Sequence, residues 1–179
     1  FEHFREFISS PNFGMLLNNT LKISIYDLIL GFFPPIILAL SLNQVLNEKI
    51  KKKIQLILYA PNFISVVVIV GMLFLFLSAN GPINSIVQKL TGNPIMFMSS
   101  PDYFRTIYIL SGIWQGIGWS SILYTATLAG VSTDLYEAAN IDAANLIQKI
   151  WHIDLPAMRP IMVISFILSA GNIMNVGYE

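Results

Sequence analysis

The 179-residue sequence contains no cysteine, and only 11% of its residues are charged. Without cysteine, the sequence has no disulfide framework, thiolate zinc site or thiol nucleophile. Soluble domains contain about 25% charged residues, so the low charge argues against a soluble globular protein. Ten basic and ten acidic side chains cancel, whereas nucleic-acid-binding proteins carry basic charge to neutralise phosphates. We therefore expect no nucleic acid as a partner.

Long charge-free stretches occupy most of the sequence. Four of them are close to or longer than the ~20 residues that a bilayer-spanning helix needs. They predict spans near residues 21–46, 54–78, 107–131 and 161–179. Pro34, Pro35 and Pro61 lie inside the first two spans, where neighbouring helices tolerate kinks. The expected fold is an all-α, polytopic transmembrane helix bundle that forms a single domain.

The charges between the spans predict their orientation, because lysine and arginine collect in cytoplasmic loops. Four lysines lie within residues 49–53, between the first two spans, and Lys149 and Arg159 lie between the last two. Both of these loops are therefore expected to face the cytoplasm. The turn-rich segment 79–106 and the amino-terminal residues 1–20 are then expected outside.

The loop between the last two spans, residues 132–160, has a helical pattern of its own. Asp134 and Glu137 have the spacing of a capping box, which predicts that a short helix begins there. A second helix is expected to end or kink at Pro156. It has an apolar stripe at helical spacing, formed by Leu146, Ile147, Ile150 and Trp151. A membrane interface, the protein's own spans or a partner protein could each cover this stripe.

A further set of residues in this loop follows the spacing Glu-Ala-Ala-x-x-Asp-x-Ala, with Ile-x-Leu-Pro downstream. They are Glu137, Ala138, Ala139, Asp142, Ala144, Trp151, Ile153, Leu155, Pro156 and Pro160. This pattern resembles the EAA loop of binding-protein-dependent ABC importer permeases. The family usually has Gly where this chain has Ala143, which implies either a strained turn or a more nearly continuous bend. The resemblance implies that the loop docks on ATPase subunits through Glu137, Ala138, Ala139, Asp142, Ala143, Ala144, Leu155 and Pro156.

Other parts of the chain resemble carbohydrate-type permeases, and residues 171–178 resemble the subgroup that imports complex oligosaccharides and polysaccharides. The resemblance implies a six-span permease of the bacterial cytoplasmic membrane, of which this chain is an internal fragment. Oligosaccharides would cross by alternating access, driven by ATP hydrolysis on partner subunits, since the sequence has no phosphate-binding loop motif. The implied partners are ABC ATPase subunits, a second permease subunit, an extracytoplasmic solute-binding protein and membrane lipid.

Polar and aromatic side chains within the expected spans are candidates for a sugar pathway, because they suit the hydroxyl edges and apolar faces of saccharides. The candidates are Asp27, Trp114, Gln115, Trp119, Asn172 and Asn175. Helix packing or an interfacial position explains the same residues, and Gly112 and Gly116 form a small-xxx-small packing pattern.

Two rival functions are an ion-coupled secondary transporter and an intramembrane enzyme. The first typically has several intramembrane charges and inverted repeats, and neither is evident. The second needs a polar catalytic pair, but Asp27 is the sole buried carboxylate candidate. His3 and His152 are the only histidines, and they are expected on opposite sides of the membrane. We therefore expect no catalytic residue, metal or cofactor.

Overall fold

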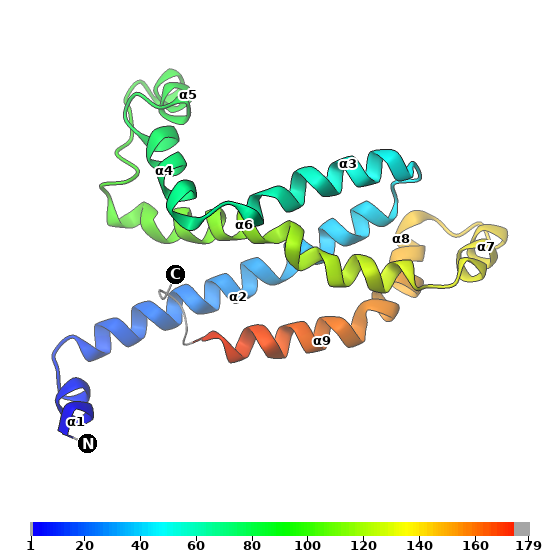
Figure 1. Ribbon diagram of the computed structural model, residues 1–179, viewed down its shortest axis with the longest axis horizontal. Coiled ribbons are helices and arrows are strands. Elements are labelled where there is room, and N and C mark those ends of the chain that lie inside the picture. The colour runs from blue at the N-terminus through cyan, green and yellow to red at the C-terminus, as the bar shows by residue number, and fades with distance from the viewer. Residues whose placement is uncertain (1, 174–179) are drawn as a thin grey trace.

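The structure is a computed structural model and describes residues 2–173. Throughout that range the chain forms helices and the turns that join them (Figure 1). The helices are α1 (Glu2–Ile8), α2 (Phe13–Asn43), α3 (Glu48–Tyr59), η1 (Ala60–Phe63), α4 (Val66–Leu77), α5 (Pro82–Thr91), α6 (Pro101–Ala129), α7 (Thr133–Ile141), α8 (Leu146–Lys149), η2 (Ile150–Asp154) and α9 (Leu155–Gly171). The expected all-α helical bundle is confirmed.

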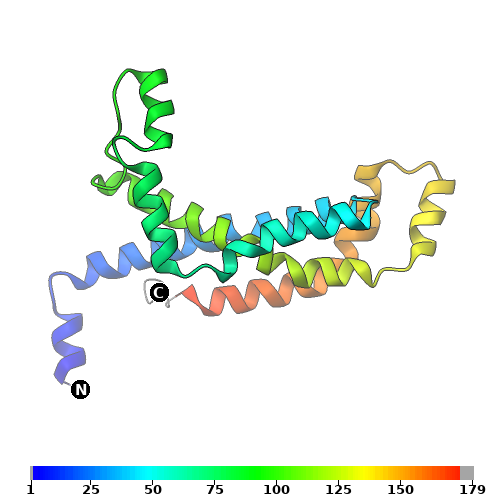
Figure 2. The ribbon, with the colours of Figure 1, turned by 45° about the horizontal axis from the view of Figure 1, so that its top comes forward.

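Three long helices, α2, α6 and α9, lie side by side and form the body of the molecule (Figures 1 and 2). Helix α2 continues through Pro34 and Pro35 and packs along α6. The buried core between the three helices contains Ile36, Ala39, Tyr124, Leu128 and Met158. Many large apolar side chains on the outer faces are exposed, as expected for a surface that lipid or another subunit covers.

The closest backbone approach involves a different glycine from the two that the sequence suggested. A Cβ atom at Gly118 would overlap the backbone carbonyl of Leu58, so this glycine lets α6 and α3 touch. A Cβ atom at Gly112 or Gly116 would meet nothing within 4 Å. The expected small-xxx-small contact is therefore absent from the described chain, and Gly118 has its role.

The stretch expected as one span at residues 54–78 is divided. It contains the end of α3, the short helix η1 with buried Pro61, and α4, which turns away from the bundle (Figures 1 and 2). Proline has no N–H to continue the helix, which accounts for the interruption. Helix α4 then begins at Val66, directly after the N-cap residue Ser65. The Ser65 hydroxyl accepts a hydrogen bond from the Val68 N–H at 3.4 Å.

The segment 79–106, expected as turns, contains helix α5 and the first residues of α6. Asn84 on α5 is fully buried and fastens this region to the end of α4. Its side-chain amide donates to the carbonyl oxygens of Ser78 at 2.9 Å and Ile95 at 2.7 Å. Its oxygen accepts from the Ile95 N–H at 2.8 Å. Helices α4 and α5 therefore form a helical hairpin.

Within residues 2–173, three helical segments are long and apolar enough to cross a membrane: Phe13–Asn43, Val66–Thr91 and Leu146–Gly171. The first begins before the expected residue 21. Helix α6, at the position of the expected span 107–131, has 29 residues but falls outside this set because glycine, serine and glutamine lower its hydropathy. Because α6 packs against α2, α3 and α9, part of its surface contacts protein and does not have to be apolar enough for lipid.

Candidate functional site

Residues 132–154, which we call the elbow, project beyond the bundle where α6 ends and α9 begins (Figure 1). The first helix of the elbow, α7, begins at Thr133, and the Ser132 hydroxyl accepts a hydrogen bond from the Asp134 N–H at 3.3 Å. The capping box expected at Asp134 and Glu137 is therefore wrong, because Ser132 occupies the N-cap position. Serine is among the preferred N-cap residues.

A capping box is present one helix later. The Asn145 side chain accepts from the Gln148 N–H at 2.9 Å, and the Gln148 side chain accepts from the Asn145 N–H at 2.7 Å. These reciprocal bonds satisfy N–H groups that would otherwise lack partners at the start of α8. They fix the point at which the chain re-enters a helix after the turn at Ala143.

The turn between α7 and α8 has Ala143 in the left-handed region, with φ +53°. The Ala144 N–H bonds to the Ala139 carbonyl at 2.8 Å, and the Ala143 N–H bonds to the Asn140 carbonyl at 3.1 Å. These two bonds define a Schellman motif, whose left-handed position is usually glycine. Of the two alternatives left open by the sequence, the structure has the strained turn. Left-handed backbone costs a residue with a Cβ atom about 1–2 kcal/mol.

The side chains of the Glu-Ala-Ala pattern face outward from α7. Glu137, Ala138 and Asp142 are exposed, whereas Ala139 and Ala144 are partly buried. A hollow of about 330 Å³ lies between α7 and the helices that follow, lined by Ala139, Asp142, Ala144, Gln148, Lys149, His152 and Ile153. The Lys149 ammonium also donates to the Asn140 side chain at 2.5 Å, which ties α8 to α7.

The apolar stripe predicted on the second elbow helix stays largely uncovered by the described chain. Ile147 is 65% exposed and Trp151 is 64% exposed, and Ile141 at the end of α7 is 86% exposed. Of the four stripe residues, the described helices partly bury Ile150 and leave Leu146, Ile147 and Trp151 exposed. For the exposed residues of the stripe, two of the three alternatives are left: a membrane interface or a partner protein.

Pro156 kinks the helical path and does not end it. The helix continues from α8 through η2 into α9, and the widened π turn of η2 has the Leu155 N–H bonded to the Ile150 carbonyl. Proline lacks an N–H, and its ring clashes with the carbonyl four residues earlier, here that of His152. The wider turn before Pro156 gives that carbonyl room. Leu155 is partly buried and Pro156 is exposed at the start of α9.

A polar network that the sequence did not reveal joins the elbow to the bundle. The Tyr136 hydroxyl on α7 donates to Asp154 Oδ1 at 2.5 Å and accepts from the Asn43 amide at 3.2 Å. The same Asn43 amide lies 3.4 Å from Asp154 Oδ1. Asp154 is fully buried, and its Oδ2 has no hydrogen-bond partner. Burial, together with the neighbouring Asp154, raises the pKa of Tyr136 to about 12, so the hydroxyl keeps its proton.

A second candidate site is a cavity of about 640 Å³ between α2, α6 and α9, which we call the bundle cavity. Of the residues that the sequence suggested, Asp27, Trp119 and Asn172 line it. The sequence analysis missed other polar lining residues, which are Ser24, Tyr124, Ser165 and Ser169. Single serines within apolar helices gave no pattern, and only the packing of three helices brings them together.

The other pathway candidates lie elsewhere. The Gln115 amide donates to the Ile64 carbonyl at 3.0 Å, so it supplies a partner for the interrupted helix near η1. Trp114 is 47% exposed and lies outside the cavity lining. Asn175 lies outside the described residues. The described chain contains no cluster of three or more His, Cys, Asp or Glu that could hold a metal ion.

Comparison with known proteins identifies the family of the chain. Residues 31–176 match the family described as binding-protein-dependent transport system inner membrane component. The chain belongs to this family. Protein LplB of Bacillus subtilis is 40% identical over the whole chain, which covers 57% of that protein. The polygalacturonan/rhamnogalacturonan transport system permease protein YteP of the same organism is 38% identical over 99% of the chain, which covers 56% of YteP.

The fold of this permease-family chain also matches a solved structure. A bacterial ABC transporter involved in the import of the acidic polysaccharide alginate contains a chain that is 36% identical, with a TM-score of 0.93. The match covers 99% of the present chain and 63% of that one. A second matching structure, with the same identity and TM-score, is a bacterial alginate ABC transporter in complex with an alginate pentasaccharide-bound periplasmic protein. The resemblance to carbohydrate-type ABC permeases is therefore confirmed, and the present chain spans little more than half the length of its curated relatives.

Proposed function

We propose that this chain belongs to the permease subunit of an ATP-binding-cassette importer that carries oligosaccharides across the bacterial cytoplasmic membrane. The printed names of its relatives support a sugar, since they include YteP and the arabinooligosaccharide permease protein AraP. These relatives are transport permeases. Energy then comes from ATP hydrolysis on partner subunits, and alternating access moves the sugar.

The observation that carries this proposal is the exposed elbow beyond the end of the bundle. Helix α7 presents Glu137 and Ala138 to the outside, and the small alanine side chains allow a partner to approach closely. The uncovered apolar side chains Ile147 and Trp151 lie on the same elbow. This surface combines the charge of Glu137, small alanine side chains and exposed apolar groups, which suits docking to ATPase subunits. Asp142, Ala143 and Ala144 form the turn that sets the direction of α7.

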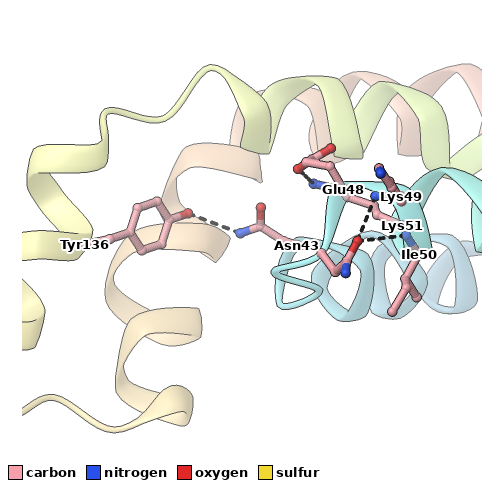
Figure 3. A network of polar contacts seen from close by, with 7 residues as sticks. Asn43, Glu48, Lys49, Ile50, Lys51 and Tyr136 are labelled. Atoms are coloured by element: carbon pink, nitrogen blue, oxygen red, sulfur yellow. Dashed lines mark hydrogen bonds and ion pairs between the residues drawn. The ribbon is translucent and has the colours of Figure 1, made fainter.

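The orientation follows from basic residues at the same end of the bundle as the elbow. Figure 3 shows Asn43 between Tyr136 on one side and the lysine-rich start of α3 on the other. Lysine and arginine favour the cytoplasmic side. The elbow therefore faces the cytoplasm, where ATP and the ATPase subunits are, and α5 faces outward.

The bundle cavity supplies one wall of the sugar pathway. Trp119 offers an aromatic face, and Asp27 and Asn172 offer polar groups. Ligand sites combine apolar lining with a few placed polar groups. A second permease subunit completes the pathway from the other side, membrane lipid covers the remaining outer surface, and an extracytoplasmic solute-binding protein delivers the sugar.

Uptake by proteoliposomes tests this proposal. The vesicles contain the full-length permease with its ATPase subunits, second permease subunit and solute-binding protein. They are offered radiolabelled oligogalacturonides or arabino-oligosaccharides. We expect uptake that requires enclosed ATP and persists when ionophores collapse the ion gradients. Uptake that needs an ion gradient and no ATP would indicate a secondary transporter, and chemical conversion of the sugar by the permease alone would indicate an enzyme.

A further inference from the structure

The polar network of Asn43, Tyr136 and Asp154 joins three elements that are distant in sequence. Asn43 is the last residue of α2, Tyr136 lies on α7, and Asp154 ends η2 directly before α9. Figure 3 shows the Tyr136 ring directed from α7 toward the Asn43 amide. One hydroxyl group therefore bonds both to the last residue of α2 and to the elbow residue directly before α9.

Helix α7 has little else to fix its position. No other described helix packs extensively against α7, and the bond between Lys149 and Asn140 connects α7 only to the next part of the elbow. The chain leaves α7 on one side through the left-handed turn at Ala143. Packing of an apolar face is what usually stabilises a helix within a protein. Since α7 has little such packing, its side-chain hydrogen bonds have a larger share in setting its orientation.

The network also lies at an irregular point of the helical backbone, the π turn of η2. The π turn of η2 interrupts the regular helical hydrogen bonds between α8 and α9, and π turns inside α-helices occur frequently at functional sites. Asp154 sits at the end of that turn and is fully buried. If Tyr136 moved away, a buried carboxylate would lose its closest donor, and such losses are costly. The bond therefore resists separate movement of α7 and η2.

We propose that Tyr136 is a positioning residue for energy coupling, which makes α7 move as one body with the inner ends of α2 and α9. The inference rests on the proposed docking of α7 to the ATPase subunits. A displacement imposed on α7 by those subunits then reaches two bundle helices directly, and these helices line the cavity. The raised pKa of Tyr136 keeps the hydroxyl protonated, so it remains a donor to Asp154 at physiological pH.

The test compares Tyr136→Phe with Tyr103→Phe in the complete transporter. Both variants remove one hydroxyl, but Tyr103 lies at the opposite end of α6 from the elbow. The measurement is the number of sugar molecules imported per ATP hydrolysed. Simple loss of folded protein lowers import and hydrolysis in proportion and leaves this ratio unchanged. For Tyr136→Phe we expect normal ATPase co-purification. The number of sugar molecules imported per ATP should be about 5-fold lower than in the wild type, which is the lower end of typical coupling between two sites. Tyr103→Phe should keep the wild-type ratio.

A spin-label measurement follows the geometry directly. Labels on cysteines that replace Leu135 on α7 and Gln44 after α2 report the distance between the two elements. The distribution should broaden in Tyr136→Phe, and Asn43→Ala provides a milder second variant with a change in the same direction. A wild-type import ratio in Tyr136→Phe, with docking retained, would overturn this inference alone. Failure of the wild-type permease to bind ATPase subunits would overturn the docking proposal and the inference together.

Discussion

The backbone N–H of Ala144 donates to the carbonyl oxygen of Ala139 at 2.8 Å, which reverses the chain at the end of α7. The bond forms because Ala143, between them, adopts φ +53°. Glycine reaches this conformation without the steric cost that alanine has. The angle between the two elbow helices is therefore held at the expense of local strain.

Replacing Ala143 with glycine should relieve this strain. The gain is offset in part by the greater flexibility of glycine in the unfolded chain, so we expect α7 to be stabilised by at most about 1 kcal/mol. Hydrogen exchange of the α7 amides in the purified permease measures the change. Ala138→Gly is the control, since glycine inside a helix should destabilise α7 by about 1 kcal/mol. Equal destabilisation by both variants would show that Ala143 is unstrained.

Replacing Gly118 with alanine should separate α6 from α3. The new Cβ atom would overlap the Leu58 carbonyl, which is backbone and cannot move aside alone. Such overpacking typically costs about 1–3 kcal/mol. Thermal unfolding of the purified protein should occur at lower temperature. Gly112→Ala lies on the same helix with open space around its Cβ position and should be neutral or stabilising. If both alanine variants unfold at the wild-type temperature, the close helix crossing is absent.

Replacing Trp119 with alanine should weaken transport of sugar. Trp119 lines the bundle cavity, whereas Trp114 lies outside that lining on the same helix. Loss of an aromatic contact of about 0.5–1.5 kcal/mol corresponds to a decrease of roughly 2- to 12-fold in transport efficiency. Uptake at equal amounts of membrane-inserted protein measures the effect, with Trp114→Ala as the control. The same decrease in both variants would remove the cavity from the proposed pathway.

Much of the fold follows from local sequence patterns. The charge-free stretches locate α2, α6 and α9 to within several residues, because a membrane span requires a minimum apolar length. The Glu-Ala-Ala pattern identifies the family, which comparison confirms. These features depend on neighbouring residues along the chain, so one sequence is sufficient to reveal them.

Contacts between distant residues account for what the sequence did not predict. Asn43 lies 93 positions from Tyr136 and 111 positions from Asp154, and no spacing rule connects them. The role of Gly118 depends on where α3 crosses α6, at Leu58. Ser132 was overlooked as the N-cap because Asp134 offered an equally acceptable cap two residues later. Tertiary packing decides each of these points.

Docking of α7 to ATPase subunits is the central claim, and Glu137→Lys tests it most directly. Glu137 is exposed on α7, and reversing its charge would leave an interfacial partner group unpaired. That loss can reach about 2–5 kcal/mol when the charge pair is desolvated. Asp134→Lys makes the same charge change on the same helix outside the Glu-Ala-Ala pattern and should cost only about 0.3–1 kcal/mol through the helix dipole.

The decisive measurement is sugar uptake together with ATPase co-purification, in the full-length permease with its partners. For Glu137→Lys the account predicts loss of uptake and weakened co-purification, with normal membrane insertion, while Asp134→Lys stays near wild type. Wild-type uptake and wild-type co-purification in Glu137→Lys would contradict it.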